Sequence, residues 1–302
     1  MKNKVKIALL GGDLRHYTAA VHLCKDPWEV FLWGMDLAKK EESSLIFCKT
    51  YQEAIEGAAA VILPLPTSVD GYTLNSPLNA EGESLKLREL LEVMDASTLL
   101  VGGRIPHEFS ILANTKGVKT VDFFEREDFQ IRNAYTTAEA ALSIAMNSMT
   151  REIRGAKIAV TGYGRISKCL VDLLLGMGAD VTVAARKDAD LSFAEIKGAH
   201  TLKIDGTQQS AGMQSLMHGF DVVYNTVPCW LFDRHFLENV DKNTFLIDLA
   251  SAPGGVDICA AKELNSNVLW ATSLPGKYAP LSAGQWIASC VDRILSGEVA
   301  CV

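Results

Sequence analysis

The 302-residue sequence contains no long hydrophobic run. Its longest apolar stretches, residues 5–10 and 58–65, fall far short of the roughly 20 residues that cross a bilayer. The amino terminus reaches Gly11-Gly12 without the apolar core or the small-residue cleavage site of a signal peptide. We therefore expect a cytoplasmic protein with no membrane segment.

The sequence also lacks an excess of basic residues and any paired cysteine motif. It has 29 Lys and Arg against 36 Asp and Glu, so nothing indicates a surface for nucleic acid or anionic lipid. Its 7 cysteines are scattered and odd in number, with no CxxC pair, which argues against a disulfide framework and a zinc cluster. We expect reduced thiols, no metal, and anions that bind only locally.

Short apolar runs alternate with amphipathic stretches along the whole chain, the pattern of an α/β protein. We expect two Rossmann-like, doubly wound parallel sheets that face a cleft. Strands are predicted in the first half at 6–10, 29–33, 59–63, 98–101 and 120–123, and in the second half at 157–161, 180–184, 200–204, 221–226, 244–248 and 267–271. Helical patterns separate them, for example at 18–25, 84–94 and 107–116.

Chain length favours two domains, and capping patterns indicate where they join. We expect a substrate domain at 1–135, a linking helix at 136–155, a cofactor domain at 156–280 and a final helix at 281–302 that packs back on the first domain. Thr136 with Glu139, and Ser282 with Gln285, fit capping boxes that would begin the two helices.

A glycine-rich turn follows the predicted strand at 157–161 and precedes an amphipathic helix. In this context Gly162 permits the tight turn, Gly164 lets the backbone approach a pyrophosphate, and Ser167 replaces the third glycine of the dinucleotide fingerprint. Tyr163, Arg165 and Ile166 complete the predicted segment. The competing interpretation is a glycine-rich turn that binds nothing.

The next strand ends in basic residues where NAD-binding proteins carry an acidic one. Arg186 and Lys187 suit the extra 2′-phosphate of NADP, so we predict NADP rather than NAD. The alternative is a solvated loop. The remaining predicted cofactor contacts follow two later strands, and they are Asn225, Thr226, Val227, Pro228, Asp248 and Leu249. Loop support and turn capping are the simpler roles for Asn225 and Asp248.

Polar residues at the carboxyl ends of the first domain's strands predict a substrate site. Two arginines, Arg15 and Arg104, suggest a dicarboxylate, because a guanidinium grips a carboxylate with two hydrogen bonds. Ion pairs of these arginines with Asp13 and Glu108 are the alternative. The other predicted substrate contacts are Thr67, Ser68, Tyr278 and Ser282. Candidates for proton transfer are Asp13, Glu139 and Lys277, whereas we assign no catalytic role to the histidines.

Seven motifs in this order resemble those of the dipicolinate synthase A-subunit family. They are Gly11-Gly12-Asp13-Leu14-Arg15, Leu63-Pro64-Leu65-Pro66, Thr137-Ala138-Glu139, Gly162-Tyr163-Gly164-Arg165, Asn225-Thr226-Val227-Pro228, 248–255 and 274–284. The resemblance implies NADP-dependent conversion of 4-hydroxy-tetrahydrodipicolinate to pyridine-2,6-dicarboxylate in the mother cell of a sporulating bacterium. It also implies that a flavoprotein-like B subunit is the partner, and that the two-domain fold is related to that of 2-hydroxyacid dehydrogenases. We further expect a homo-oligomer.

Two other functions remain open on the sequence. One is a non-catalytic subunit that binds NADP or dicarboxylate for a partner, because no acid–base pair stands out. The other is an oxidoreductase of the 2-hydroxyacid dehydrogenase type, whose imidazole acid would follow the sixth strand of the cofactor domain. No histidine occurs from residue 267 to the end, which disfavours this second alternative.

Overall fold

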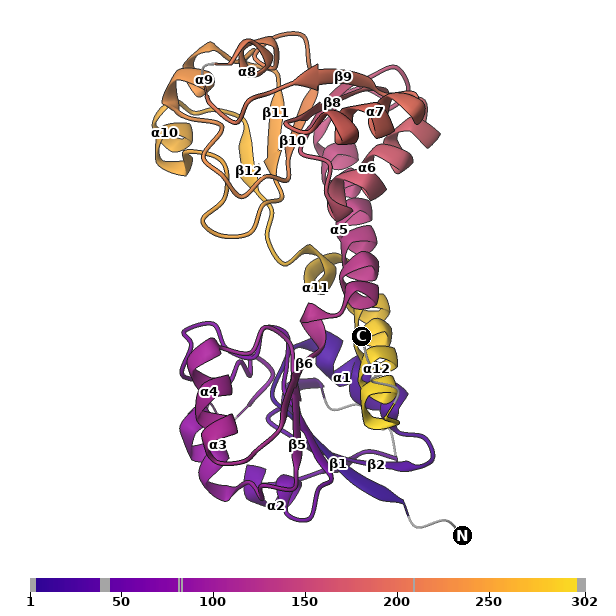
Figure 1. Ribbon diagram of the computed structural model, residues 1–302, viewed down its shortest axis with the longest axis vertical. Helices are drawn as coiled ribbons and strands as arrows, with labels where there is room; N and C mark the ends of the chain where they lie inside the picture. The colour runs from indigo at the N-terminus through magenta and orange to yellow at the C-terminus, as the bar shows by residue number, and fades with distance from the viewer. Residues whose placement is uncertain (1–3, 39–43, 81, 83, 209, 298–302) are drawn as a thin grey trace. The chain divides into compact units, whose positions relative to one another are not determined.

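A computed structural model describes residues 4–38, 44–80, 82, 84–208 and 210–297. The chain divides into two compact units, Met1–Asn133 with Ala279–Val302, and Ala134–Tyr278 (Figure 1). Within the described residues, no helix is both long enough and apolar enough to cross a membrane.

The first unit is built on a six-stranded parallel sheet. Its strand order is β3-β2-β1-β4-β5-β6. The strands are β1 (Val5–Leu10), β2 (Trp28–Trp33), β3 (Ile46–Phe47), β4 (Ala60–Ile62), β5 (Leu99–Gly102) and β6 (Thr120–Asp122). Strand β1 is buried on both faces: Ile7 and Leu9 join one apolar cluster, and Ala8 and Leu10 join another. This explains the uninterrupted apolar run of residues 7–10 in β1, as expected for a central parallel strand.

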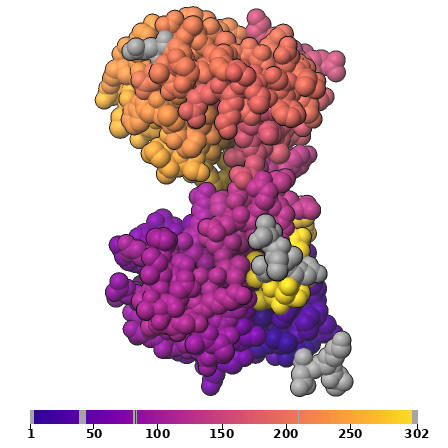
Figure 2. Space-filling model, viewed as in Figure 1, coloured from indigo at the N-terminus to yellow at the C-terminus, as the bar shows by residue number. Residues whose placement is uncertain are grey.

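Helices cover both faces of this sheet. On one face α1 (Leu14–Leu23) packs against α12 (Pro280–Leu295), so the end of the chain belongs to the amino-terminal unit; Figure 2 shows these yellow residues set among indigo and magenta ones. The other face carries α2 (Tyr51–Ile55), α3 (Leu87–Val93) and α4 (His107–Thr115). Gly284 allows the close approach of α12 to α1, because a Cβ there would lie 2.5 Å from the Arg15 carbonyl oxygen. Two short 3-10 helices, η1 (Asp36–Ala38) and η2 (Phe123–Glu125), complete the unit.

The second unit repeats this plan, with the strand order β12-β11-β10-β7-β8-β9. Its strands, again all parallel, are β7 (Lys157–Thr161), β8 (Asp180–Ala185), β9 (His200–Lys203), β10 (Val222–Asn225), β11 (Phe245–Asp248) and β12 (Val268–Trp270). Helices α5 (Glu127–Ser148), α6 (Arg165–Gly176) and α7 (Asp188–Ile196) contribute to the core on one face. Helices α8 (Ala211–Ser215), α9 (Arg234–Asn239) and α10 (Ile258–Glu263) cover the other, and α11 (Leu274–Tyr278) follows β12.

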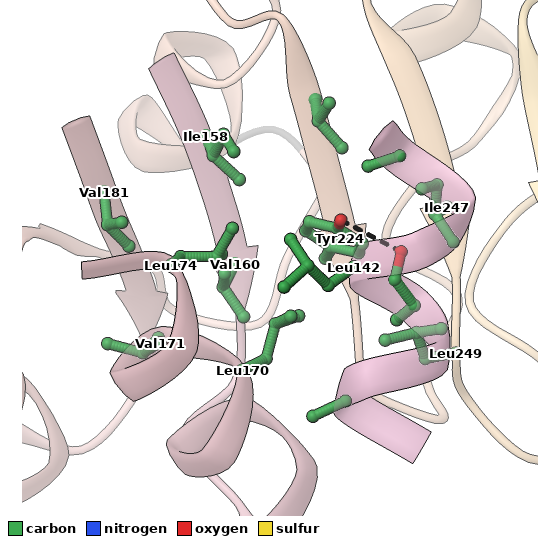
Figure 3. Packing of buried hydrophobic residues seen from close by; sticks show 14 of the residues in the cluster. Leu142, Ile158, Val160, Leu170, Val171, Leu174, Val181, Tyr224, Ile247 and Leu249 are labelled. Atoms are coloured by element: carbon green, nitrogen blue, oxygen red, sulfur yellow. Dashed lines mark hydrogen bonds between the residues drawn. The ribbon is translucent and has the colours of Figure 1, made fainter. Parts of the chain in front are cut away.

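The core under α5 and α6 is mostly apolar, and it contains the fully buried phenol of Tyr224. Figure 3 shows Leu142, Leu170 and Leu174 against the sheet residues Ile158, Val160 and Ile247. The Tyr224 hydroxyl donates to the Ala141 carbonyl oxygen at 3.1 Å, the dashed line in that view. Burial raises the pKa of Tyr224 well above its ordinary value, so this phenol stays protonated.

Both sheets confirm the predicted α/β class and its two Rossmann-like parallel sheets, since each has the doubly wound order 3-2-1-4-5-6. Strand β3 and helix α2 were not predicted, because two and five residues are too short to show a period. Both capping boxes are wrong. Helix α5 already begins at Glu127, with acidic residues in its first turn, and ends at Ser148, so Thr136 and Glu139 lie inside it. Helix α12 begins at Pro280, which needs no side-chain cap at the first helical position, and places Ser282 inside.

The turn after β1 is held by a buried histidine. Gly12 has φ 101°, and a Cβ on it would lie 2.5 Å from His16 Cβ and 2.8 Å from Cγ. His16 is 1% exposed, and its Nε2 lies 3.3 Å from the Ile62 carbonyl oxygen. Burial lowers the pKa of His16 to about 4, so the ring is neutral near pH 7. Glycine at position 12 is therefore required both by its backbone angle and by the imidazole beside it.

We expect Gly12→Ala to destabilise the first unit by about 3 kcal/mol, because it adds a steric clash to backbone strain. Gly57→Ala is the matched control: Gly57 has φ 68°, but a Cβ there would meet nothing within 4 Å, so only a strain of about 1 kcal/mol is added. Urea unfolding followed by tryptophan fluorescence measures both. Equal losses in the two variants would show that the His16 contact is unimportant.

The histidine also predicts a pH dependence. Its folded pKa of about 4 lies below the ordinary histidine value of 6.5, so the unfolded chain binds a proton first and stability falls as pH drops from 6.5 to 4. Over this window we expect His16 to remove about 3 kcal/mol from the free energy of unfolding. His16→Gln lacks this titration. Its free energy of unfolding should depend less steeply on pH between 6.5 and 4 than that of the wild type, and identical slopes would contradict the argument.

Candidate functional site

The second unit presents an open glycine turn at the carboxyl end of its central strand β7. Gly162 has φ 83°, and a Cβ on it would lie 2.8 Å from Thr226 Oγ1 and 2.9 Å from Val227 Cγ2, so no larger residue fits. Gly164 lies at the amino end of α6, and a Cβ built there would meet no atom within 4 Å. The N–H groups at such a helix end are suited to binding a phosphate group.

Residues around this turn have distinct roles. Ser167 is fully buried, and its hydroxyl hydrogen-bonds that of Thr226 at 2.7 Å, while Thr226 donates to the Thr161 carbonyl oxygen at 2.8 Å. These bonds tie α6 to the loop after β10. Tyr163 and Ile166 pack into the apolar core, whereas Arg165, the first residue of α6, is exposed. The small residue predicted at position 167 thus allows close packing and adds a hydrogen bond.

The equivalent turn of the first unit is filled by protein. A Cβ on Gly11 would lie 3.0 Å from both the Asn75 carbonyl oxygen and Ser76 Cβ. The Gly12 N–H donates to the Asn75 carbonyl oxygen at 2.8 Å, and Asp13 caps α1. The Gly12 N–H is thus already bound by protein, and Asp13 stands at the helix cap where the second unit has Gly164. By this comparison the residues of the second unit fit a dinucleotide and those of the first do not.

Two basic side chains extend from the end of β8. Arg186 and Lys187 are exposed, and neither forms an ion pair within the described part of the chain. Gly206, in the loop after β9, lies against the arginine stem, because a Cβ there would be 3.0 Å from Arg186 Cδ. Lys203 nearby differs, since it is paired with Asp188. Free cations at this strand end suit a 2′-phosphate.

The side chains of Asn225 and Asp248, two of the predicted cofactor contacts, are hydrogen-bonded within the protein. Both are fully buried. The Asn225 amide accepts from Thr161 Oγ1 at 2.6 Å and donates to Asp248 Oδ1 at 2.8 Å. The Asp248 carboxylate also accepts from the main-chain N–H groups of Ala250 and Gly255. This network fixes the loops after β10 and β11, the role that turn preference had offered as the alternative.

The other predicted residues of these loops differ in exposure. Thr226 and Val227 are half-buried beside Gly162, Pro228 is exposed, and Leu249 is buried. Of this group, Thr226, Val227 and Pro228 therefore offer surface at the turn.

In the first unit Arg15 is engaged with protein. Its guanidinium forms two-point hydrogen bonds with the Asp13 carboxylate, the shortest at 2.7 Å, and donates to the Leu65 carbonyl oxygen at 2.6 Å. The Arg15 side chain is only 8% exposed. The ion pair considered as an alternative is thus confirmed, and the arginine holds the loop after β4.

The loop after β4 is itself closed by hydrogen bonds. Thr67 is fully buried, and its hydroxyl lies 3.2 Å from the Gly103 carbonyl oxygen. Ser68 donates to Asp70 at 2.9 Å, and Asp70 in turn accepts from the N–H groups of Tyr72 and Thr73. These bonds lower the pKa of Asp70 far below its ordinary value. The predicted substrate contacts at 67 and 68 therefore shape this loop.

Arg104 is different, because it is exposed and unpaired. It lies after β5 with φ 51°, an uncommon angle for a residue with a side chain. Its guanidinium stands over the Phe124 ring at 4.4 Å, and no ion pair with Glu108 or any other described carboxylate is formed. Sequence reasoning missed Phe124 and its neighbour Asp122. The signal was present as an acid followed by two aromatics at the end of a predicted strand.

The remaining predicted residues lie on helices. Glu139 is exposed on α5, Lys277 and Tyr278 are exposed on α11, and Ser282 is exposed in α12. The first three belong to the second unit and Ser282 to the first. Each of these side chains reaches solvent.

Comparisons with known proteins agree with the architecture. The family model for the amino-terminal domain of the dipicolinate synthase A subunit matches residues 6–124. The dipicolinate synthase A subunit of Bacillus subtilis (strain 168) is 26% identical over 296 residues, covering 98% of this chain and 97% of the relative. The crystal structure of the dipicolinate synthase A subunit from Bacillus halodurans has a TM-score of 0.86 at 25% identity, covering 98% of this chain and 99% of that one.

A more distant structure shares the fold. The apo-structure of D-lactate dehydrogenase from Escherichia coli has a TM-score of 0.61 at 15% identity, covering 97% of this chain and 98% of that one. The two units thus have the Rossmann-like plan of 2-hydroxyacid dehydrogenases. The family model thus matches the amino-terminal part of the chain, and over nearly its whole length the chain is similar in sequence and structure to dipicolinate synthase A subunits.

Proposed function

We propose that the chain is the A subunit of a dipicolinate synthase, an NADP-dependent oxidoreductase that forms pyridine-2,6-dicarboxylate from 4-hydroxy-tetrahydrodipicolinate during sporulation. The observation that carries this proposal is the open turn at Gly164 beside a free Arg186 and Lys187, in a chain similar over its length to proteins named as dipicolinate synthase A subunits. The first unit, whose equivalent turn is filled, is left for the substrate.

NADP would be held by the second unit. The Gly162–Gly164 turn and the amino end of α6 would bind the pyrophosphate, and Arg186 with Lys187 the 2′-phosphate. Thr226, Val227 and Pro228 would line the adjoining surface. The chemistry that such a cofactor supplies is acceptance of a hydride. The protein's own residues orient the reactants and exclude competing reactions.

The substrate carries two carboxylates, and the reaction removes one water, one hydride and one proton as the ring becomes aromatic. Arg104 is the anchor for a carboxylate, because its guanidinium is exposed and unpaired while that of Arg15 is engaged with Asp13. Tyr278 and Ser282 are proposed as further contacts. Holding the ring in one orientation lowers the barrier by removing rotational freedom before reaction.

Proton transfer needs a side chain that can reach the substrate. Glu139 and Lys277 are exposed and are the primary candidates. Asp13 is a weaker candidate than Glu139 and Lys277, because its ion pair with Arg15 would have to break first. We also propose that the chain forms a homo-oligomer. Its proposed partner is a flavoprotein-like B subunit.

The proposal predicts turnover by the purified full-length chain. With freshly generated 4-hydroxy-tetrahydrodipicolinate and NADP, we expect dipicolinate to form, measured by its ultraviolet absorbance, above the rate without protein. Tight NADP binding without product would instead favour a binding subunit that needs its partner. Absence of both product and NADP binding would refute the assignment from the glycine turn onward.

The cofactor preference has its own test. Arg186→Ala with Lys187→Ala should weaken NADPH binding roughly 10- to 100-fold, because two charge-assisted contacts to the 2′-phosphate are lost. NADH binding should change little. Lys203→Ala is the matched control, since this neighbouring lysine is already paired with Asp188. Isothermal titration calorimetry of both nucleotides measures the effect, and a parallel loss for NADH would contradict the assignment.

A further inference from the structure

We propose that the segment Asp122-Phe123-Phe124, at the end of β6 and the start of η2, is a positioning element that presents Arg104 to a carboxylate of the substrate. The inference rests on the proposed function, and it identifies residues that would set affinity without touching the ligand. These three consecutive residues contact three consecutive residues, Gly103 to Ile105, of the loop after the neighbouring strand β5.

Asp122 fixes the backbone of Arg104. Its Oδ1 accepts from the Arg104 N–H at 3.1 Å and from the Phe124 N–H at 2.8 Å, and its Oδ2 accepts from the Ile105 N–H at 2.8 Å. One carboxylate thus binds donors on both loops. These bonds support the left-handed conformation of Arg104 at φ 51°, which a residue with a Cβ adopts only at an energetic cost.

Phe123 supports the same turn from the core. It is fully buried, and a Cβ on Gly103 would lie 2.7 Å from Phe123 Cζ and 2.9 Å from Leu65 Cβ. The chain at Gly103 therefore lies directly on the phenyl ring. This contact holds the backbone at Gly103 in place, so the backbone that carries the Arg104 side chain is rigid.

Phe124 supports the guanidinium. The Arg104 Cζ lies 4.4 Å from the centre of the Phe124 ring, within the range of a cation–π interaction. That ring contacts Phe129 edge-on at 6.1 Å, and Phe129 contacts Phe123 at 5.2 Å. The aromatic series connects the cation to the core and limits the rotamers of a long side chain.

This arrangement matters because a flexible arginine loses conformational entropy when it binds. Ordering such a side chain restricts its rotamers, and this loss of entropy opposes binding. An arginine that is already held on a ring and on a fixed turn has lost part of that freedom before the ligand arrives. Preorganisation of this kind increases affinity without adding a contact.

The test is a double-mutant cycle on the full chain saturated with NADPH, with dipicolinate as the titrated ligand. Phe124→Leu should weaken dipicolinate binding roughly threefold to tenfold, from the usual range for a cation–π contact. In an Arg104→Ala background the same substitution should have no further effect, because the ring then has no cation to hold. Phe124→Tyr should restore affinity close to that of the wild type.

Asp122→Asn should act in the same direction, because an amide nitrogen cannot accept from the N–H groups that the carboxylate now binds. Asp95→Asn is its matched control: Asp95 accepts from the Ser97 N–H at 2.8 Å in an exposed turn elsewhere in the unit. NADPH affinity should remain unchanged in every variant, which separates loss of positioning from loss of folding.

The outcomes distinguish this inference from the proposed function. If the wild-type chain binds no dipicolinate, or if Arg104→Ala binds it normally, the assignment of Arg104 as the substrate anchor is wrong. The positioning role of residues 122–124 is then refuted as well. If Arg104→Ala weakens binding but Phe124→Leu has no effect, or an equal effect in both backgrounds, the anchor stands and the positioning role is overturned.

Discussion

Each sheet has a tight turn after its first strand, β1 in the first unit and β7 in the second. The groups packed against this turn decide which part of it stays open in each unit. In the second unit, Gly162 lies against Thr226 and Val227, which brings the turn down on the sheet and leaves the space at Gly164 open. In the first unit the Gly12 N–H is bound by the Asn75 carbonyl oxygen, and Asp13 caps the helix where the second unit has Gly164. One strand order therefore carries an open glycine at the helix cap in one unit and a carboxylate at the same place in the other.

Hydrogen-bonded polar side chains at the strand ends hold the loops of both units in place. Around the second sheet, Asn225 and Asp248 use their hydrogen-bonding groups on neighbouring loops and so hold the shape of those loops. Around the first, two half-buried carboxylates do the same: Asp13 acts through Arg15 on the loop after β4, and Asp122 acts on the loop after β5. Satisfied buried groups of this kind make loop positions rigid, because breaking one bond leaves a desolvated partner.

Apolar patterning predicted most of the fold, because central strands such as β1 and β10 are short apolar runs that a parallel sheet buries on both faces. The two-residue β3 carries too little pattern to be recognised, and β12 is only partly buried yet was still found. Helix starts were harder. Thr136 and Glu139 have the spacing of a capping box, but helix α5 begins well before them, at Glu127, where acidic side chains favour its first turn.

The site was predicted only in part, because a sequence shows which groups are available and not how they are used. Arg15 and Arg104 look equivalent as basic residues after predicted strands, yet Arg15 is closed by Asp13 and the Leu65 carbonyl oxygen. Arg104 differs in two ways. Asp122 holds its backbone in a left-handed conformation, and an aromatic ring rather than a carboxylate lies beneath its guanidinium. An aromatic face stabilises the cation while leaving its N–H edge available, and a carboxylate would occupy that edge. Phe124 at this position therefore leaves the N–H edge of the Arg104 guanidinium available, as the proposed role of the arginine requires.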